Sequence, residues 1–230
     1  MNDELAKALR ANVQEFYETN GSAFSQSRTF IWKEETILAE RIRPEMIVVD
    51  VGAGNGRFAR LLPAGTTYIG FEPSEALRRA ANPAFDLRPG GFPRVPLADA
   101  FTDLAMSFAV IQHLPTPEER RDAASELIRL VKPGGLIAVT SWHPTVAVTH
   151  KIIEPLTNGD AGDLWVSWRA ETPDAKRYIH DFSFEEWTEL WQHPALEIEK
   201  CGLFGKEDWT KDLAEGRNWF VIARRKHLAI

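Results

Sequence analysis

The sequence predicts an α/β fold, with a doubly wound and mostly parallel sheet covered by helices on both faces. Three observations support this prediction. Short β-branched segments alternate with amphipathic segments over residues 46–141, which is typical of βαβ units. A glycine-rich segment directly follows the first of these strands. The composition, 44% hydrophobic and 26% charged, favours one globular domain over residues 1–230.

Two helices are expected ahead of the sheet. Apolar residues recur every three or four positions over residues 3–16, which indicates an amphipathic helix. The polar stretch of residues 19–27 is expected to end it, and a second helix is predicted over residues 32–41. We therefore expect residues 1–45 to form a helical lid on the core of the domain.

The core is expected at residues 46–141. Strands are predicted at residues 46–51, 67–71, 104–110 and 136–141, and helices at residues 56–62, 74–81 and 117–131. Because a connection between parallel strands must cross a face of the sheet, this alternation predicts a sheet that is buried on both faces.

An insertion is expected after the last parallel strand. Residues 142–176 lose the alternation and gather Pro, Gly, Trp and His, which predicts a substrate-side insertion over residues 142–193. In doubly wound folds ligands bind at the carboxyl ends of the strands, where this insertion begins. Residues 194–230 should close the sheet. We expect a helix at residues 183–191 and closing strands at residues 196–200 and 219–223.

The composition excludes several classes of protein. Cys201 is the only cysteine, so an intramolecular disulfide is excluded and a cysteine-based zinc site is not expected. The histidines show no metal-site spacing, and no apolar run approaches the ~18 residues of a membrane helix. The acidic start is unlike a signal peptide. We expect a cytoplasmic protein with no metal and no membrane association.

The charge distribution argues against a broad nucleic-acid surface. The net charge is −6, with −9 on residues 1–199 and +3 on residues 200–230. A protein that binds nucleic acid through its phosphates usually carries a positive face. Arg224, Arg225 and Lys226 near the end of the chain are therefore either phosphate contacts or solvated charges.

The strongest local signal is the glycine-rich segment after the first strand. Asp50 lies near the end of that strand, and Gly52, Gly54 and Gly56 follow at alternate positions. Glycine allows a tight turn and a close approach to a ligand, and the start of a helix leaves N–H groups unpaired. Glu72, 22 residues beyond Asp50, ends the next strand, where a carboxylate can accept hydrogen bonds from both hydroxyls of a ribose. These residues predict a nucleotide-type cofactor.

The spacing leaves three interpretations open. A dinucleotide site requires the spacing GxGxxG, but Arg57 stands where the third glycine of that motif would lie. The glycines could instead only shape a tight turn between strand and helix. Finally, the spacing GxGxG with an acidic residue just before it resembles motif I of class I S-adenosylmethionine (SAM)-dependent methyltransferases.

Further segments resemble this methyltransferase family in the same order. They are Asp86-Leu87, residues 108–114, and residues 131–135, which should form the turn into the last parallel strand. The resemblance implies a Rossmann-like fold and S-adenosyl-L-methionine as the cofactor. The cofactor-binding residues that it implies are Asp50, Gly52, Ala53, Gly54, Gly56, Glu72, Asp86, Leu87 and Phe108.

The flanking segments resemble a narrower family, the methyltransferases that esterify 5-carboxymethyluridine at the wobble position of tRNA. The matching residues are Tyr17, Phe24, Ser25, Ser27, Arg28 and Trp32 before the core, and Arg177, Tyr178, His180, Phe182, Glu185, Glu186 and residues 217–222 after it. This resemblance implies tRNA as a partner and a small zinc-binding activator protein such as accompanies relatives in the family. It also implies that Tyr17 and Trp32 contact the cofactor.

Several residues depart from the pattern of the narrower family. Ala53 replaces a cysteine within the glycine-rich segment, Gln112 replaces the first histidine of a His-His pair, and Lys33 replaces a proline. Asp181 and the insertion at residues 142–176 also differ. These departures bear on the substrate more than on the cofactor.

The chemistry of methyl transfer makes Arg28, His113 and Arg177 the catalytic candidates. Transfer from a sulfonium is an in-line displacement, so alignment of the reactants supplies most of the catalysis. A carboxylate acceptor is ionised at pH 7 and needs no base, and a guanidinium fork matches its two oxygens. A phenol, amine or thiol acceptor would need a base such as His113. His113 and His180 also fit purely structural roles.

Three functions fit these residues. The flanking segments favour a methyltransferase that acts on a tRNA wobble uridine or a related carboxylate. The acidic net charge and the altered insertion favour a small-molecule O- or N-methyltransferase. A SAM-binding module without turnover would keep the same motifs. The aromatic residues Tyr17, Phe24 and Trp32 are either a lid over the cofactor or part of the core.

Overall fold

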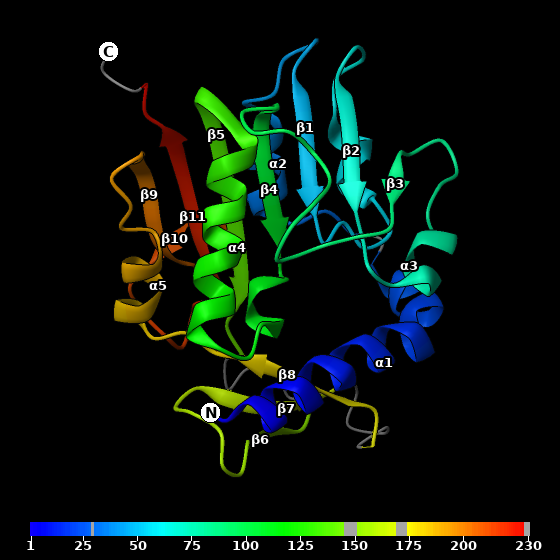
Figure 1. Cartoon of the computed structure of the whole chain (residues 1–230), viewed down its shortest axis with the longest axis vertical. Coiled ribbons are helices and arrows are strands. Elements are labelled where there is room, and N and C mark those ends of the chain that lie inside the picture. Colours follow the sequence, from blue (N-terminus) through cyan, green and yellow to red (C-terminus); the bar gives the residue numbers. More distant parts are fainter. Residues whose placement is uncertain (29, 145–150, 169–173, 228–230) are drawn as a thin grey trace.

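The computed structural model describes residues 1–28, 30–144, 151–168 and 174–227. Within these residues the main sheet has eight strands in the order β10-β9-β11-β5-β4-β1-β2-β3, and a second sheet has three strands in the order β6-β7-β8. Helices cover both faces of the main sheet (Figure 1). The predicted α/β fold with a mostly parallel central sheet is confirmed.

The parallel strands form one side of the main sheet. β1 (Ile47–Val51) pairs in parallel with β2 (Thr67–Phe71) on one side and with β4 (Thr102–Phe108) on the other. β5 (Val131–Trp142) continues the sheet beyond β4, and β3 (Leu87–Arg88) continues it beyond β2. Because parallel strands run the same way, their carboxyl ends meet at one edge, the lower edge in Figure 1.

Antiparallel strands complete the other side of the sheet. β11 (Asn218–Arg225) lies between β5 and β9 (Leu196–Phe204), and β10 (Trp209–Thr210) pairs with β9 at the edge. The two predicted closing strands are therefore present. Each is longer than predicted, because the backbone pairing of β9 continues to Phe204 and that of β11 includes the polar residues Asn218, Arg224 and Arg225.

Two apolar layers enclose the sheet. Buried side chains of α4 (Pro117–Leu130) and α5 (Phe184–Leu190) pack on one face. Those of α2 (Lys33–Ala39) and the short 3-10 helix η1 (Arg57–Leu61) pack on the other. The helix predicted at residues 56–62 is present as a short 3-10 helix, because the segment makes only a tight turn after its glycines.

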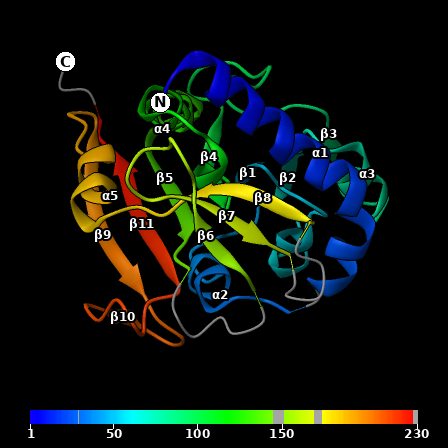
Figure 2. The same cartoon turned by 90° about the horizontal axis from the view of Figure 1, so that it is seen from below.

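The first helix, α1 (Asp3–Ser27), is longer than predicted. The prediction that residues 19–27 end it is wrong, because this half packs against α3 (Glu75–Arg79). A Cβ at Gly21 would lie 3.0 Å from an alanine methyl of α3. Glu18 accepts hydrogen bonds at 2.7 and 3.2 Å from two N–H groups at the start of α3. In Figures 1 and 2, α1 runs across the carboxyl edge of the sheet.

The predicted insertion contains the second sheet. β6 (Ile153–Pro155), β7 (Asp163–Ser167) and β8 (Lys176–His180) are antiparallel neighbours. These strands were not predicted, because the mixture of Pro, Gly, Trp and His in this part of the sequence shows no strand pattern. Residues 145–150 and 169–173 of the insertion lie outside the described residues. Figure 2 shows β8 crossing the carboxyl edge of the main sheet alongside α1.

Side-chain hydrogen bonds hold β8 in place. Asn12 of α1 accepts from the N–H of Tyr178 at 3.1 Å and donates to the carbonyl of Lys176 at 3.2 Å. The buried carboxylate of Asp163 accepts from the Tyr178 hydroxyl at 2.7 Å and from Nδ1 of His180 at 2.9 Å. These contacts agree with the structural interpretation of His180.

β5 begins earlier than predicted. Residues 131–135, expected to form the turn into this strand, are part of it, and the pairing with β4 shifts register between Thr102 and Leu104. Gly135 permits this irregularity, since a Cβ there would lie 2.7 Å from the carbonyl oxygen of Asp103. The remaining predicted elements agree with the structure to within a few residues at their ends.

Candidate cofactor and acceptor site

The glycine-rich segment forms a backbone cradle at the carboxyl end of β1. The N–H groups of Gly52 and Ala53 both donate to the carbonyl of Phe71, at 2.7 and 3.0 Å. Gly52 has a φ of +83°, and a Cβ there would lie 2.2 Å from a methyl of Val110. Gly54 has a φ of +59°, and no described atom lies within 4 Å of the position of its Cβ. A ligand can therefore approach the backbone closely at Gly54.

Two buried carboxylates adjoin this cradle. Glu72 accepts hydrogen bonds from the N–H of Gly54 at 2.9 Å and from the N–H of Ser74 at 2.8 Å. Asp50 accepts one from the Tyr68 hydroxyl at 2.8 Å. Burial raises the pKa of Glu72 and that of Asp50 to about 7 in each case. Tyr68 carried no signal in the sequence beyond its position in a predicted strand.

The end of α1 and the start of α2 are tied to the cradle. Asn55 donates to the hydroxyl of Ser25 at 2.8 Å. Arg57 donates from Nε to Glu35 at 3.0 Å, and its guanidinium lies 4.2 Å from the centre of the Trp32 ring. Glu35 also accepts a hydrogen bond from the N–H of Trp32 at 2.7 Å. The predicted N-terminal lid residues therefore lie against the glycine loop through Arg57, Asn55 and Glu35.

His113 is held between α1 and β8 at the end of a short 3-10 turn, Ile111–His113. Its Nδ1 lies 2.9 Å from the carbonyl oxygen of Tyr178, and its Nε2 lies 3.0 Å from the hydroxyl of Tyr17. Because a carbonyl only accepts, Nδ1 carries the proton and Nε2 accepts from Tyr17. Burial, reinforced by the charge of Arg177, lowers the pKa of His113 to about 3. The ring is neutral at physiological pH.

Two arginines lie beside the aromatic face of α1. The guanidinium of Arg28 is 4.7 Å from the centre of the Phe24 ring, and that of Arg177 is 5.8 Å from it. Arg177 is 3% exposed, and its Nε and Nη1 lack hydrogen-bond partners. Burial and the charge of Arg177 lower the pKa of Arg28 to about 10. Within the described residues, no carboxylate forms an ion pair with either side chain, so the arrangement can bind an anion.

The remaining residues predicted to bind the cofactor lie in different surroundings. The side chain of Leu87 lies against the cradle, 3.4 Å from the position of a Cβ at Gly56. Asp86 instead turns its exposed carboxylate to Arg88, at 3.0 and 2.6 Å. Phe108 packs with the apolar side chains on the α2 face of the sheet.

The comparisons with known proteins agree with this geometry. A family model described as a methyltransferase domain matches residues 49–139. A protein of Encephalitozoon cuniculi named as a methyltransferase is 32% identical over 181 residues, which cover 77% of this chain and 83% of that protein. The chain belongs to the class I SAM-dependent methyltransferases. The predicted family, enzyme class and cofactor, SAM, are confirmed.

Two further similarities concern more specific proteins. The methyltransferase is 30% identical over 131 residues to the tRNA (carboxymethyluridine(34)-5-O)-methyltransferase of Arabidopsis thaliana, covering 56% of this chain. The chain spans only about a third of that plant protein, 32% of its length. A solved complex of the Haloferax volcanii Trm112 methyltransferase activator with a methyltransferase matches with a TM-score of 0.63 and 17% identity, over 93% of this chain and 99% of that one.

Two of the basic residues near the end of the chain, Arg224 and Arg225, form hydrogen bonds within the fold. Arg225 donates to the carbonyls of Ile128, Arg129 and Val131, and Arg224 donates to Glu199. These residues end β11, opposite the start of β5, and so lie at the edge of the sheet away from the glycine loop. The structure thus gives these two arginines partners within the fold, and the two interpretations made from the sequence, phosphate contact or solvated charge, stay predictions.

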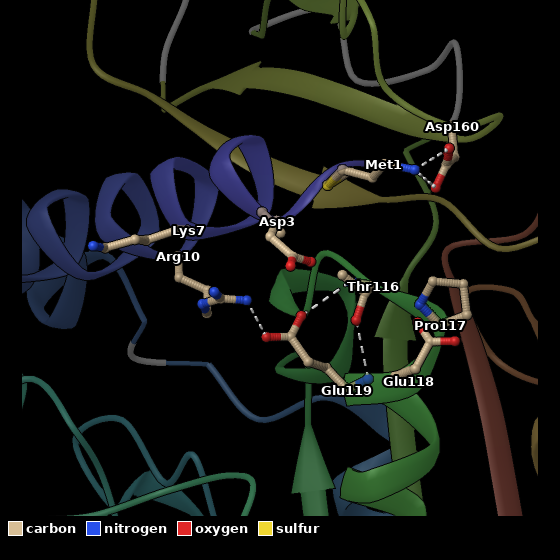
Figure 3. Close-up of a pocket in the computed structure, with 10 residues that line it drawn as sticks. Met1, Asp3, Lys7, Arg10, Thr116, Pro117, Glu118, Glu119 and Asp160 are labelled. Carbon is tan, nitrogen blue, oxygen red and sulfur yellow. Dashed lines mark hydrogen bonds and ion pairs between the residues drawn. The ribbon is translucent and has the colours of Figure 1, made fainter.

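A separate cavity of about 760 Å³ lies between the first turns of α1 and α4 (Figure 3). The N-terminal amine of Met1 pairs with Asp160 at its rim, and Arg10 pairs with Glu119. It does not adjoin the glycine loop. Among the described residues, no helix is long and apolar enough to cross a membrane, and no group of three metal-ligating side chains occurs.

Proposed function

We propose that this methyltransferase transfers the methyl group of SAM to a carboxylate, and that this carboxylate is the 5-carboxymethyl group of a tRNA wobble uridine. The pair of guanidiniums on Arg28 and Arg177, without an ion pair among the described residues, carries the proposal. A carboxylate would give the buried charge of Arg177 the partner that it lacks, and a guanidinium fork holds both oxygens in a fixed orientation.

The residues at the cradle fit the cofactor. Gly54 leaves open space beside its backbone, and Glu72 would accept hydrogen bonds from the ribose hydroxyls. Leu87 beside Gly56 would offer apolar surface to the base. When bound, SAM supplies a methyl group to which the acceptor oxygen forms a C–O bond, while the C–S bond breaks and its electron pair returns to sulfur.

The chain's own residues would orient the acceptor without moving a proton. An ionised carboxylate needs no base, which agrees with a neutral His113 that already accepts a hydrogen bond from Tyr17. His113 would therefore position the Tyr17 hydroxyl beside the reacting groups. Arg177, whose guanidinium lies beside Tyr17, would hold the carboxylate in line, and alignment is the main source of rate for a displacement of this kind.

The similarity to the plant tRNA methyltransferase supports the choice of acceptor. It extends over 131 residues, and the N-terminal residues that resemble the wobble-uridine family, Tyr17, Phe24, Arg28 and Trp32, lie together near the cradle. Arg177, which lies beyond the parallel core in sequence, lies close to the same aromatic residues.

A chemical treatment of tRNA gives a sharp test. Mild alkaline hydrolysis converts wobble 5-carboxymethyl esters to free carboxylates, and the same tRNA left untreated is the matched control. Incubation with methyl-labelled SAM should label only the hydrolysed tRNA, and nucleoside mass spectrometry should find the ester restored. Label on both tRNAs alike, or on neither, would contradict the tRNA assignment.

A second candidate is a methyltransferase of small carboxylic acids. The net charge of −6 and the engagement of Arg224 and Arg225 within the fold favour a substrate without a phosphate backbone. Supplying free 5-carboxymethyluridine and simple carboxylic acids in the same assay separates the two candidates. Activity on these acids that survives ribonuclease treatment, with none on hydrolysed tRNA, would establish the second.

We also propose a small activator protein as a partner. The support is the solved complex that pairs the Haloferax Trm112 activator with a methyltransferase of similar fold. Adding a Trm112-type protein to the labelling assay should raise turnover, and the two proteins should elute together in size-exclusion chromatography. Separate elution with unchanged turnover would contradict this partner.

A further inference from the structure

Arg28 belongs to the cofactor side of the site. It directly follows α1, whose end is tied to the glycine loop by the hydrogen bond between Asn55 and Ser25 at 2.8 Å. The guanidinium of Arg28 lies 6.0 Å from the centre of the Trp32 ring, and that of Arg57, at the start of η1, lies 4.2 Å from the same ring. Arg28 and the glycine loop therefore share the Trp32 side of the lid.

The balance of charge on this side leaves one cation free. Asp50 and Glu72 are acidic, and Arg57 is already paired with Glu35 at 3.0 Å. Arg28 has no ion-pair partner among the described residues. The amino-acid end of the cofactor carries an ammonium and a carboxylate. Because Glu72 is assigned to the ribose, Asp50 suits the ammonium, and the carboxylate would require the cation that remains, Arg28.

Arg177 belongs to the opposite side. It lies on β8 of the second sheet, where Asn12 bonds the backbone on both sides of it. Its guanidinium lies 4.8 Å from the centre of the Phe16 ring and 5.8 Å from that of Tyr17, whose hydroxyl contacts His113. No part of the glycine loop is among these contacts within the described structure.

We propose that the two arginines bind two different carboxylates. Arg28 binds the carboxylate at the amino-acid end of the cofactor, and Arg177 binds the carboxylate of the acceptor. The second half rests on the proposed function, whereas the first half requires only that the chain bind SAM. Each ligand then neutralises one of two neighbouring like charges, and neither guanidinium is left unpaired in the ternary complex.

The cofactor half is tested by removing one carboxylate from the ligand and one guanidinium from the protein. Calorimetry compares S-adenosylhomocysteine with its decarboxylated analogue on the wild type, Arg28→Gln and Arg177→Gln. The wild type should prefer S-adenosylhomocysteine by roughly 10- to 100-fold, the range for a charged hydrogen bond. Arg28→Gln should abolish this preference by weakening only S-adenosylhomocysteine. Arg177→Gln, the matched control, should retain it.

The acceptor half is tested by kinetics at saturating SAM. Arg177→Gln should raise KM for the carboxylate acceptor by roughly 10- to 100-fold. Arg28→Gln, measured at a SAM concentration that restores saturation, should leave the acceptor KM near the wild-type value. Arg177→Lys should recover part of the loss, because it keeps the charge but not the fork.

Several outcomes would overturn the assignment. They are equal wild-type affinity for the two ligands, loss of the preference in Arg177→Gln, and equal weakening of both ligands by Arg28→Gln. If Arg28→Gln does not fold, Arg28→Lys takes its place. A weaker preference for S-adenosylhomocysteine in Arg28→Lys than in the wild type supports the proposal, and an unchanged preference overturns it. A clear ligand preference together with no activity on any carboxylate refutes the proposed function and the acceptor half, but leaves the cofactor half standing.

Discussion

The two sides of the site differ in the sign of their charge and in how fully their polar atoms are paired. On the cradle side, Asp50 and Glu72 are buried and accept hydrogen bonds from a tyrosine and from two backbone N–H groups. On the side of the second sheet, Arg177 of β8 is as deeply buried, yet its Nε and Nη1 have no partner. The carboxylates of the cradle are therefore already hydrogen-bonded within the fold, whereas Arg177 keeps donors that only a ligand could satisfy under our proposal.

Replacing Arg177 by Met should have the largest effect, in opposite directions on activity and on stability. Loss of the guanidinium should lower kcat/KM for a carboxylate by roughly 100-fold. Methionine needs no hydrogen-bond partner, so the free energy of unfolding should rise by about 1–3 kcal/mol. Steady-state kinetics and urea denaturation measure the two effects. A variant less stable than the wild type would show that the arginine is not unpaired in solution.

Glu72→Gln tests the cradle and should weaken SAM binding at pH 8 by ~1–3 kcal/mol. Because burial raises the pKa of Glu72 to about 7, wild-type affinity should also fall as the pH drops below that value. Calorimetry from about pH 6 to 8 measures both effects, and the fall should be smaller in the variant. If Glu72→Gln binds SAM as tightly as the wild type does, Glu72 does not contact the cofactor.

The same variant should change how stability depends on pH. The carboxyl of Glu72 holds its proton more tightly in the folded state than in the unfolded state, so it favours folding below its unfolded pKa of 4.5. That contribution is lost as the pH rises through about 7. Glu72→Gln should therefore gain stability relative to the wild type between pH 5 and 8, as measured by urea denaturation.

Arg225→Gln should have a modest effect, and on stability alone. The side chain donates to the carbonyls of Ile128, Arg129 and Val131 at the far edge of the sheet. Its loss should lower the free energy of unfolding by about 1–2 kcal/mol. Filter binding of tRNA should be unchanged, with Lys226→Ala as the exposed control. A fall in tRNA affinity in both variants would instead indicate that Arg225 and Lys226 contact tRNA.

The smallest effect is expected in the pH profile of kcat at saturating SAM, which should be flat from about pH 6 to 9. His113 has a pKa of about 3 and does not titrate in this range, and the carboxylate acceptor is already ionised. Initial rates with labelled SAM provide the measurement. A rising limb near pH 7 would indicate a general base, and with it a phenol, amine or thiol acceptor.

Most of the cradle could be predicted from the sequence, because its parts lie close together in the chain. Asp50, Gly54 and Glu72 belong to one unit of β1, η1 and the parallel strand β2, in which residue spacing nearly determines position in space. Asp86 shows the limit of such reasoning. Its contact with the cofactor stays a prediction, whereas its pairing with Arg88, two residues away at the surface, had no signal in the sequence.

Other parts of the site could not be predicted. Glu35 looks like a solvated residue in a charged stretch, and only its spacing of three residues from the buried Leu38 indicates a shared face of α2. Its pairing with Arg57 joins two segments that the sequence does not relate. The second sheet was missed because its strands are short and lack a clean alternation.

By itself the sequence determined the parallel core, the glycine turn and the placement of Glu72, because backbone preferences and hydrophobic periodicity act over a few neighbouring residues. Tertiary structure alone decided that α1 continues to Ser27, that His113 is neutral, and that Arg177 is buried without a partner. Burial and ion pairing depend on which distant segments meet when the chain folds. For Arg28 and Arg177, 149 residues apart, no local pattern carries that information.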